Sequence, residues 1–208
     1  MKESKLLMIK IALITISISL LLYAVFLVGN FYGLKQKTRI VHVDFDLEEQ
    51  IESDTWRYTF LKKEYSNYIE KLSSELQIDA DLVVAILIKE NPEFNPDAIH
   101  QNNNGTFDCG LMQLNDKYIY TVFVPAYWDL KNIEFNPFNW KHNLFLSMHH
   151  IQYLCESLKV QEDVIAAYNA GRGAVISGMI PASTINYVAA VKNNLKLLKM
   201  ECNNNDRN

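Results

Sequence analysis

Cysteine is scarce in this chain and is not arranged for metal binding or redox chemistry. Only three cysteines occur in 208 residues, Cys109, Cys155 and Cys202, and no two of them form a C-x-x-C pair. Zinc sites and thioredoxin-like sites use such pairs, so the sequence argues against both kinds of site. One disulfide with one cysteine left over is compatible with an exported domain, and we favour the pairing of Cys155 with Cys202.

The histidines do not make up for this shortage of metal ligands. His142, His149 and His150 lie close together in the sequence, but no cysteine or carboxylate accompanies them at ligand spacing. Adjacent histidines on a helix also face different directions. The sequence therefore predicts no metal site.

A surplus of positive charge is missing too. Removing Lys2, Glu3, Lys5 and Lys10 from the totals of 20 basic and 24 acidic residues leaves 17 and 23, a net charge of −6 with histidine neutral. Domains that bind nucleic acid are usually basic, because they must neutralise phosphates. We therefore predict no nucleic-acid partner.

Charge is absent altogether from Ile11 to Leu34. A bilayer span takes roughly 17–25 apolar residues, whereas a cleavable signal has a shorter apolar region followed by a small-residue cleavage site. No convincing cleavage site follows Val28, so the pattern favours an uncleaved membrane anchor over a removed signal peptide. Basic residues lie on both sides of the span, but the short basic head favours a cytoplasmic N-terminus and a body outside the cytoplasmic membrane.

Strand-like alternation and internal repeats are also scarce, whereas helical periodicity is widespread. The 49% hydrophobic content excludes a disordered chain and is enough to fill one core. Asp54 and Asp79 are suitable helix caps, and Pro92 and Gly171 are suitable helix ends. The pattern predicts a mainly α domain, with helices from the Asp54 cap to Leu76 and over Ala80–Asn91, Gly110–Tyr120, Trp140–Lys159, Glu162–Ala170 and Ser183–Met200. It also predicts a loop over 91–106 and an irregular stretch over 122–139.

Glu90 is the candidate for acid chemistry. Leu82, Ile86 and Glu90 recur every four residues, which puts the carboxyl group on the same stripe as buried apolar side chains. Poor solvation and the negative end of the helix dipole both raise the pKa of such a carboxyl group. An acid that stays protonated near neutral pH can give its proton to a departing sugar oxygen. Periodicity alone favours the alternative of a solvated glutamate at a fraying helix end.

Glu90 is followed by three short motifs in a fixed order: GLMQL at 110–114, AYNAG at 167–171 and Tyr187-Val188. With this order, over roughly Leu72 to Leu198, the chain resembles the soluble lytic transglycosylase family, whose catalytic domain has a goose-lysozyme-like fold. The resemblance implies a lysozyme-like catalytic domain over 54–200 that acts on peptidoglycan strands without metal or organic cofactor. An anchor over 1–34, a stalk over 35–53 and a polar tail over 201–208 would complete the chain.

The resemblance assigns roles by position. Glu90 corresponds to the family's single catalytic acid/base and Tyr187 to the tyrosine near it. Gln113 corresponds to a glutamine beside the sugar cleft, and Met112 to a residue whose backbone lines the cleft. The implied reaction breaks the β-1,4 bond between N-acetylmuramic acid and N-acetylglucosamine and closes a 1,6-anhydro ring.

Two further residues of the motifs receive roles in the same way. Tyr168 and Asn169 correspond to a pair near the reacting sugar, where a hydroxyl and an amide can bind an N-acetyl group. Without the resemblance, Tyr168 and Tyr187 would be interpreted as core aromatics, and Asn169 as a helix-end residue ahead of Gly171.

The chain departs from the family pattern at two places. Asn91 and then Pro92 follow Glu90, where the family has serine; Asn91 can still donate a hydrogen bond to a sugar or to the carboxylate. A family helix motif is met only loosely by Asn143, Ser147 and His150-Ile151, and we interpret that helix as structural.

Several alternatives stay open at this point. A hydrolysing muramidase could use Asp108 or Asp97 to orient water or to stabilise the oxocarbenium ion. A catalytically weak, wall-binding module of an envelope assembly is the other alternative, supported only by Asn91. Asp108 and Asn115, on either side of GLMQL, are more similar to the specialised transglycosylases of secretion and conjugation machines. The aromatic side chains in the irregular stretch could stack on sugars or pack in the core; they are Tyr127, Trp128 and Phe135.

Overall fold

The computed structural model of the protein describes residues 57–128 and 134–205, with the backbone alone described over 201–205. The chain divides into two units, Met1–Ile40 and Val41–Asn208, and every described residue belongs to the second. The predicted anchor and stalk lie outside the described residues. Within the described ranges, no helix is long and apolar enough to cross a membrane.

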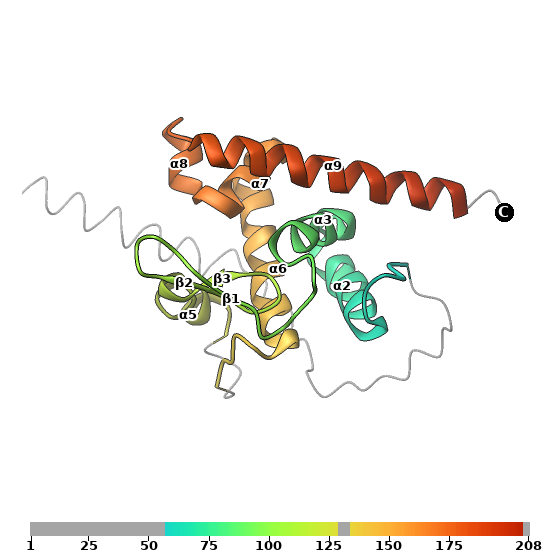
Figure 1. Cartoon of the computed structure of the whole chain (residues 1–208), viewed down its shortest axis with the longest axis horizontal. Helices are drawn as coiled ribbons and strands as arrows, with labels where there is room; N and C mark the ends of the chain where they lie inside the picture. Colours follow the sequence, from blue (N-terminus) through green and yellow to red (C-terminus); the bar gives the residue numbers. More distant parts are fainter. Residues whose placement is uncertain (1–56, 129–133, 206–208) are drawn as a thin grey trace, which may run out of the picture. The chain divides into compact units, whose positions relative to one another are not determined.

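The described part of the chain is mainly helical, as predicted (Figure 1). Its longer helices are α2 (Lys63–Leu76), α3 (Ala80–Glu90), α6 (Trp140–Ser157), α7 (Gln161–Ala170) and α9 (Ala182–Asn205). Shorter helical segments are α4 (Asp116–Tyr118), the π-helical turn η1 (Ile119–Phe123), α5 (Val124–Tyr127) and α8 (Arg172–Ile176). The predictions for α3, α6, α7 and α9 are confirmed to within a few residues, except that α9 continues past Met200.

Helix α3 lies at the centre of the core. Its residues from Asp81 to Leu87 are all buried, because α9 packs along one side of it and α2 along another. Asn194 of α9 donates a side-chain hydrogen bond of 3.2 Å to the Ala85 carbonyl. Helix α6 in turn packs against α2 and α7. This arrangement holds the C-terminal end of α3 beside the first half of α9.

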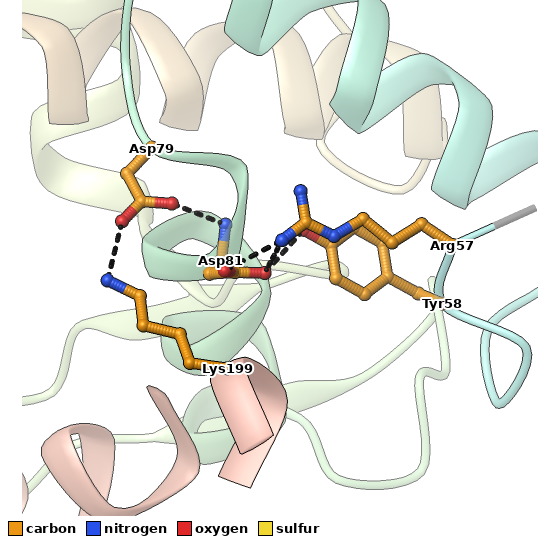
Figure 2. Close-up of polar contacts among 5 residues, drawn as sticks. All are labelled: Arg57, Tyr58, Asp79, Asp81 and Lys199. Carbon is orange, nitrogen blue, oxygen red and sulfur yellow. Dashed lines mark hydrogen bonds and ion pairs between the residues drawn. The ribbon is translucent and has the colours of Figure 1, made fainter. Parts of the chain in front are cut away.

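The start of α3 is fixed by a polar cluster (Figure 2). Asp79 caps the helix as predicted, because its carboxylate accepts the Asp81 N–H at 2.9 Å. The buried Asp81 carboxylate accepts hydrogen bonds of 2.8 and 2.9 Å from Arg57 and one of 2.9 Å from the Tyr58 hydroxyl. Lys199 pairs with Asp79 at 3.3 Å. The cluster therefore ties the chain just before α2 to the first turn of α3.

The same cluster explains why the helix predicted to start at Asp54 starts later. Leu61 donates its N–H to the Tyr58 carbonyl in a turn, and α2 begins only at Lys63. Tyr58 and Leu61 are buried, so their apolar character reflects core packing in a turn and not a helix face. The apolar spacing correctly indicated that Leu61 is buried, but it was wrong about Phe60, which is exposed, and about the local conformation.

The structure also contains a small antiparallel sheet that was not predicted from the sequence. It has the order β1 (Ile99–Gln101), β2 (Phe107–Cys109), β3 (Leu114–Asn115), with Ile99 opposite Cys109 and Asp108 opposite Asn115. Strands of two or three residues are too short to show a period of two. The predicted loop over 91–106 therefore contains β1 and the turn that leads into β2.

The helix predicted over Gly110–Tyr120 is wrong in its first half. Gly110 and Gln113 have φ values of 75° and 50°, so the GLMQ segment forms a turn between β2 and β3. Helical structure begins only at Asp116 and continues through η1 and α5, inside the stretch predicted to be irregular. Trp128 and Phe135 are buried with ring centres 5.3 Å apart, which assigns them to packing. Tyr127 is half-buried and contacts the His149 ring.

The predicted disulfide is also wrong. Cys155 is a free cysteine on α6, and so is the buried Cys109 of β2. Burial is the first cause that raises the pKa of each thiol above its usual value. Both side chains therefore behave as small, mostly apolar packing groups, as free cysteine usually does.

Candidate active site

Glu90 is the last residue of α3, where the helix ends at Asn91 and Pro92 follows. Burial raises the pKa of its carboxyl group to about 7. A hydrogen bond from Tyr187 and the charge of Lys89 act against this shift, and the charge of Asp108 adds to it. Glu90 therefore exchanges its proton near neutral pH, as a residue that must act first as an acid and then as a base requires.

Tyr187 of α9 is buried and donates its hydroxyl to Glu90 Oε1 at 2.5 Å. Burial and then the charge of Glu90 raise the pKa of Tyr187 well above its usual value, so it stays a neutral donor. Tyr187 thus engages Oε1 of the Glu90 carboxyl group from α9. Lys89 Nζ lies 5.5 Å from the centre of the Tyr187 ring.

The GLMQ turn is held by one buried side chain, Asn143 of α6. The Asn143 Oδ1 atom accepts the Met112 N–H at 2.7 Å, and its Nδ2 atom donates to the carbonyls of Cys109 and Pro137 at 3.0 and 2.9 Å. A single amide thus satisfies three backbone groups. Asn143 was interpreted as structural from the sequence, where its position in the loosely matched helix motif was the only signal of this role.

Gly110 allows the close approach between this turn and Asn143. Its φ of 75° lies in the left-handed region, and a Cβ atom there would overlap the Pro137 carbonyl oxygen and the Asn143 amide. Only glycine combines that backbone conformation with the absence of a side chain. Close packing therefore requires glycine at position 110. The contact that this glycine allows with Asn143 positions the rest of the GLMQ motif.

The turn places the Met112 carbonyl next to α7. Tyr168 of α7 donates its hydroxyl to the Met112 carbonyl at 2.9 Å. Burial and then the charge of Glu90 raise the pKa of the Tyr168 hydroxyl above its usual value. Gln113 Nε2 donates to the Gly110 carbonyl at 2.8 Å and to the Ala98 carbonyl at 3.3 Å. The structure thus joins Tyr168 to the GLMQ turn through Met112, and of these residues Tyr168 is the one whose pKa the charge of Glu90 raises.

Asn91 is occupied inside its own loop. Its Nδ2 atom donates to the Asn95 carbonyl at 2.6 Å and its Oδ1 atom accepts the Asn95 N–H at 3.1 Å. The side chain is buried. These bonds fix the chain directly after Glu90, so the structure gives Asn91 a loop-forming role where the sequence predicted contact with sugar.

The two aspartates of the muramidase alternative differ in their surroundings. Asp108 of β2 is half-buried, accepts a 2.7 Å hydrogen bond from Asn115 and is close enough for its charge to raise the pKa of Glu90. Asp97 is exposed, and its own N–H bonds to Asn95. Asp108 is therefore the one of the two that shares an electrostatic environment with Glu90.

Histidine does not form a metal site in the described ranges, where no group of three or more His, Cys, Asp or Glu side chains is placed to hold an ion. Burial lowers the pKa of His150 to about 4, so it is neutral. The His150 ring lies against Phe123 and Tyr168, with ring centres 4.4 and 5.8 Å away. His149 Nδ1 donates to the Phe145 carbonyl of its own helix at 2.9 Å.

These features define a mainly helical, lysozyme-like domain built around one acid at the end of a buried helix. The model of the transglycosylase SLT domain family matches residues 67–179. That match covers more than half of the chain, and the protein belongs to the transglycosylase SLT domain family.

The fold is also found in a solved structure, an inactive mutant of lytic transglycosylase Slt from Pseudomonas aeruginosa. The two share 16% sequence identity and superpose with a TM-score of 0.53 over 66% of this chain. The matched region is 24% of the Slt chain, so this chain corresponds to about a quarter of that enzyme. No curated protein sequence matches the chain at a significant level.

Proposed function

We propose that this protein is a peptidoglycan lytic transglycosylase that cleaves the β-1,4 bond between N-acetylmuramic acid and N-acetylglucosamine, with Glu90 as its single acid/base. The observation that carries the proposal is the state of Glu90. Burial raises its pKa to about 7, and the Tyr187 hydroxyl donates a hydrogen bond to Oε1. Membership of the SLT domain family supports the substrate class.

The reaction needs two proton transfers through the same group. Protonated Glu90 gives its proton to the glycosidic oxygen as the bond from that oxygen to C1 of muramic acid breaks. The resulting Glu90 carboxylate then takes the proton of the C6 hydroxyl, and O6 bonds to C1 to close the 1,6-anhydro ring. Glu90 ends protonated and no water is consumed, so neither an enzyme nucleophile nor a second carboxylate is needed.

Hydrolysis is the second candidate, and Asp108 is the observation that favours it. Its charge reaches Glu90, and a second carboxylate that activates water would make the enzyme a muramidase. Asp108 already accepts a hydrogen bond from Asn115 within the small sheet. That bond gives Asp108 a structural function, so we expect Asp108→Asn to reduce turnover much less than a change at Glu90.

The wall-binding alternative drew its support from Asn91. Because Asn91 holds the loop after Glu90, its presence in place of serine does not argue against catalysis. Under the binding-module alternative, the protein would adsorb to insoluble peptidoglycan and release no soluble fragments.

Replacement of Glu90 by glutamine tests the proposal. Glu90→Gln keeps the side-chain volume but can neither donate nor reclaim the proton, so we expect turnover to fall by about 10⁴-fold or more. Glu93→Gln, in the exposed loop three residues later, is the matched control and should turn over normally. Release of soluble muropeptides at the wild-type rate by Glu90→Gln would refute the mechanism.

We also propose that the protein is held in the cytoplasmic membrane by residues 1–34, with the domain outside, where peptidoglycan lies. The support is the uncharged stretch from Ile11 to Leu34 and the substrate class. A specialised role beside a secretion or conjugation assembly is the proposed context. A reporter fused after Asn208 that works only in the cytoplasm would contradict the orientation.

A further inference from the structure

The turn between α8 and α9 exposes three large apolar side chains. Ile176 at the end of α8 is 60% exposed, Met179 in the turn is 73% exposed, and Ile185 near the start of α9 is 62% exposed. Figure 1 shows this turn beyond the N-terminal end of α9. Ile185 precedes the buried Tyr187 by two residues, which places it on the side of the helix opposite the candidate active site. We call residues 176–185 the α8–α9 tip.

The backbone of the α8–α9 tip fixes the exposure of Met179. Helix α8 ends in a Schellman turn, in which Met179 donates its N–H to the Ala174 carbonyl at 3.0 Å and Gly178, with a φ of 70°, donates to the Val175 carbonyl at 3.1 Å. In such a turn the residue at the position of Met179 usually makes an apolar contact with its own helix. Met179 instead extends into solvent. Exposed apolar side chains in a defined turn are typical of an interaction surface.

The segment that contains the tip has no acidic residue. Residues 164–200 include four basic side chains and neither Asp nor Glu, which leaves 16 basic and all 24 acidic residues for the rest of the chain. Lys192 and Lys199 of this segment pair with carboxylates outside it at 2.6 and 3.3 Å. Arg172 and Lys196 are exposed, and neither has an acidic partner within the described ranges. The apolar tip is therefore accompanied by unpaired positive charge in a protein that is acidic elsewhere.

An anionic lipid surface matches both properties. Its headgroups attract exposed lysine and arginine, and the boundary below them accepts apolar side chains. Lys196 follows Ile185 by 11 residues, close to three helical turns, so the two lie on the same side of α9. We propose that the α8–α9 tip docks on an anionic bilayer, with Ile176 and Met179 among the headgroups and Arg172 and Lys196 against lipid phosphates. The proposal does not depend on catalysis, and the proposed N-terminal anchor would keep a bilayer within reach of the tip.

Protection of the tip from a water-soluble reagent tests this inference. The full chain carrying Met179→Cys is reconstituted into vesicles of phosphatidylcholine and into vesicles of phosphatidylcholine with an equal amount of phosphatidylglycerol. A membrane-impermeant maleimide then labels the thiol at position 179, and labelling of the native cysteines is measured with the wild-type chain. Labelling should be slower by about ten-fold or more in the anionic vesicles, because the two cations strengthen docking there.

Val160→Cys is the matched control. Val160 is apolar and 51% exposed, but it lies just before α7, at the end of that helix remote from α8, and Glu162 and Asp163 follow it. Its labelling should be the same in both kinds of vesicle. The double substitution Arg172→Glu with Lys196→Glu should remove the protection of the tip. It should leave the release of muropeptides from lipid-free peptidoglycan unchanged.

Salt provides a second measurement that needs no charge substitution. Raising the ionic strength screens the lipid charge, so it should speed the labelling of Met179→Cys in anionic vesicles toward the rate in neutral ones. Equal labelling in both kinds of vesicle would overturn the proposal, and so would protection that salt does not reduce. Protection that grows with the protein-to-lipid ratio, whatever the lipid charge, would overturn it by showing that a second copy covers the tip. Failure of the wild-type protein to cleave peptidoglycan would refute the proposed function instead, because the labelling comparison involves no cleavage.

Discussion

Tyr187 and Glu90, which are 97 positions apart in the sequence, share a 2.5 Å hydrogen bond in which the phenol is the donor. The bond joins the first half of α9 to the last residue of α3. It stabilises the charged carboxylate and thereby limits the increase in pKa that burial causes. The acid is consequently strong enough to donate a proton and, once ionised, basic enough to take one back.

Tyr187→Phe should move the pH profile upward. Activity requires protonated Glu90, so kcat/KM should decline as the pH rises through the pKa of about 7. The phenylalanine variant lacks the hydrogen bond that lowers this pKa, so its alkaline limb should lie at higher pH, although its maximal rate falls. Initial rates of muropeptide release across the pH range measure the effect. A limb displaced to lower pH would contradict the role of Tyr187.

Glu90→Gln should stabilise the fold at alkaline pH. The folded-state pKa of about 7 lies above the ordinary value of 4.5, so the unfolded chain releases this proton first as the pH rises. The wild-type protein therefore loses stability between those two values, by up to about 1.4 kcal/mol per pH unit. Glutamine has no such loss, and its advantage in urea unfolding should be larger at about pH 8 than at about pH 5.

The control for that comparison is Glu93→Gln, which removes an exposed carboxylate from the loop that follows α3. Its effect on unfolding should be small at either pH. An advantage of Glu90→Gln that does not change with pH would mean that Glu90 has no raised pKa in the folded protein.

Gly110→Ala should disrupt the GLMQ turn. The new methyl group would overlap the Pro137 carbonyl and the Asn143 amide. Gly105→Ala is the matched control, since Gly105 has a similar φ of 80° but no atom within 4 Å of the added Cβ. Both variants are strained by the backbone, so the difference isolates the overlap, which we expect to cost about 1–3 kcal/mol more at Gly110. Equal free energies of unfolding would contradict the packing role of Gly110.

Tyr58→Phe should destabilise the domain by about 1–2 kcal/mol, because it removes a hydrogen bond to the buried carboxylate of Asp81. Tyr68→Phe is the matched comparison. The Tyr68 hydroxyl is buried without a hydrogen-bond partner among the described residues, so its removal should be neutral or stabilising. Chemical denaturation of the two variants measures the contrast. A larger loss for Tyr68→Phe would contradict the assignment of the cluster around Asp81.

Much of the helical framework could be predicted from the sequence, because long helices carry their own signals. Asp79 is a cap with a clear local partner, and α3 is apolar nearly all round, so both its start and its burial follow from a short window. The position of Glu90 on the buried stripe likewise predicted a raised pKa, which is confirmed. The resemblance of the motifs to the SLT family was confirmed by the match over residues 67–179.

The remaining features depend on contacts between distant segments. Tyr58 is held by Asp81, 23 positions later, and this contact replaces the first turns of the predicted α2. The GLMQ turn depends on Asn143, 31 positions after Met112. Thr184 was not singled out, because nothing near it in the sequence indicates that its hydroxyl meets Asn169. Such pairings come from tertiary packing, which local patterns do not encode.

The mass of the products tests the central claim most directly. Wild-type protein is incubated with purified peptidoglycan, and the released muropeptides are analysed by mass spectrometry. Ring closure by the C6 hydroxyl consumes no water, so the account predicts 1,6-anhydromuropeptides that are one water lighter than hydrolysed fragments. Muropeptides ending in reducing muramic acid, with a large loss of activity in Asp108→Asn, would contradict it and identify a hydrolase.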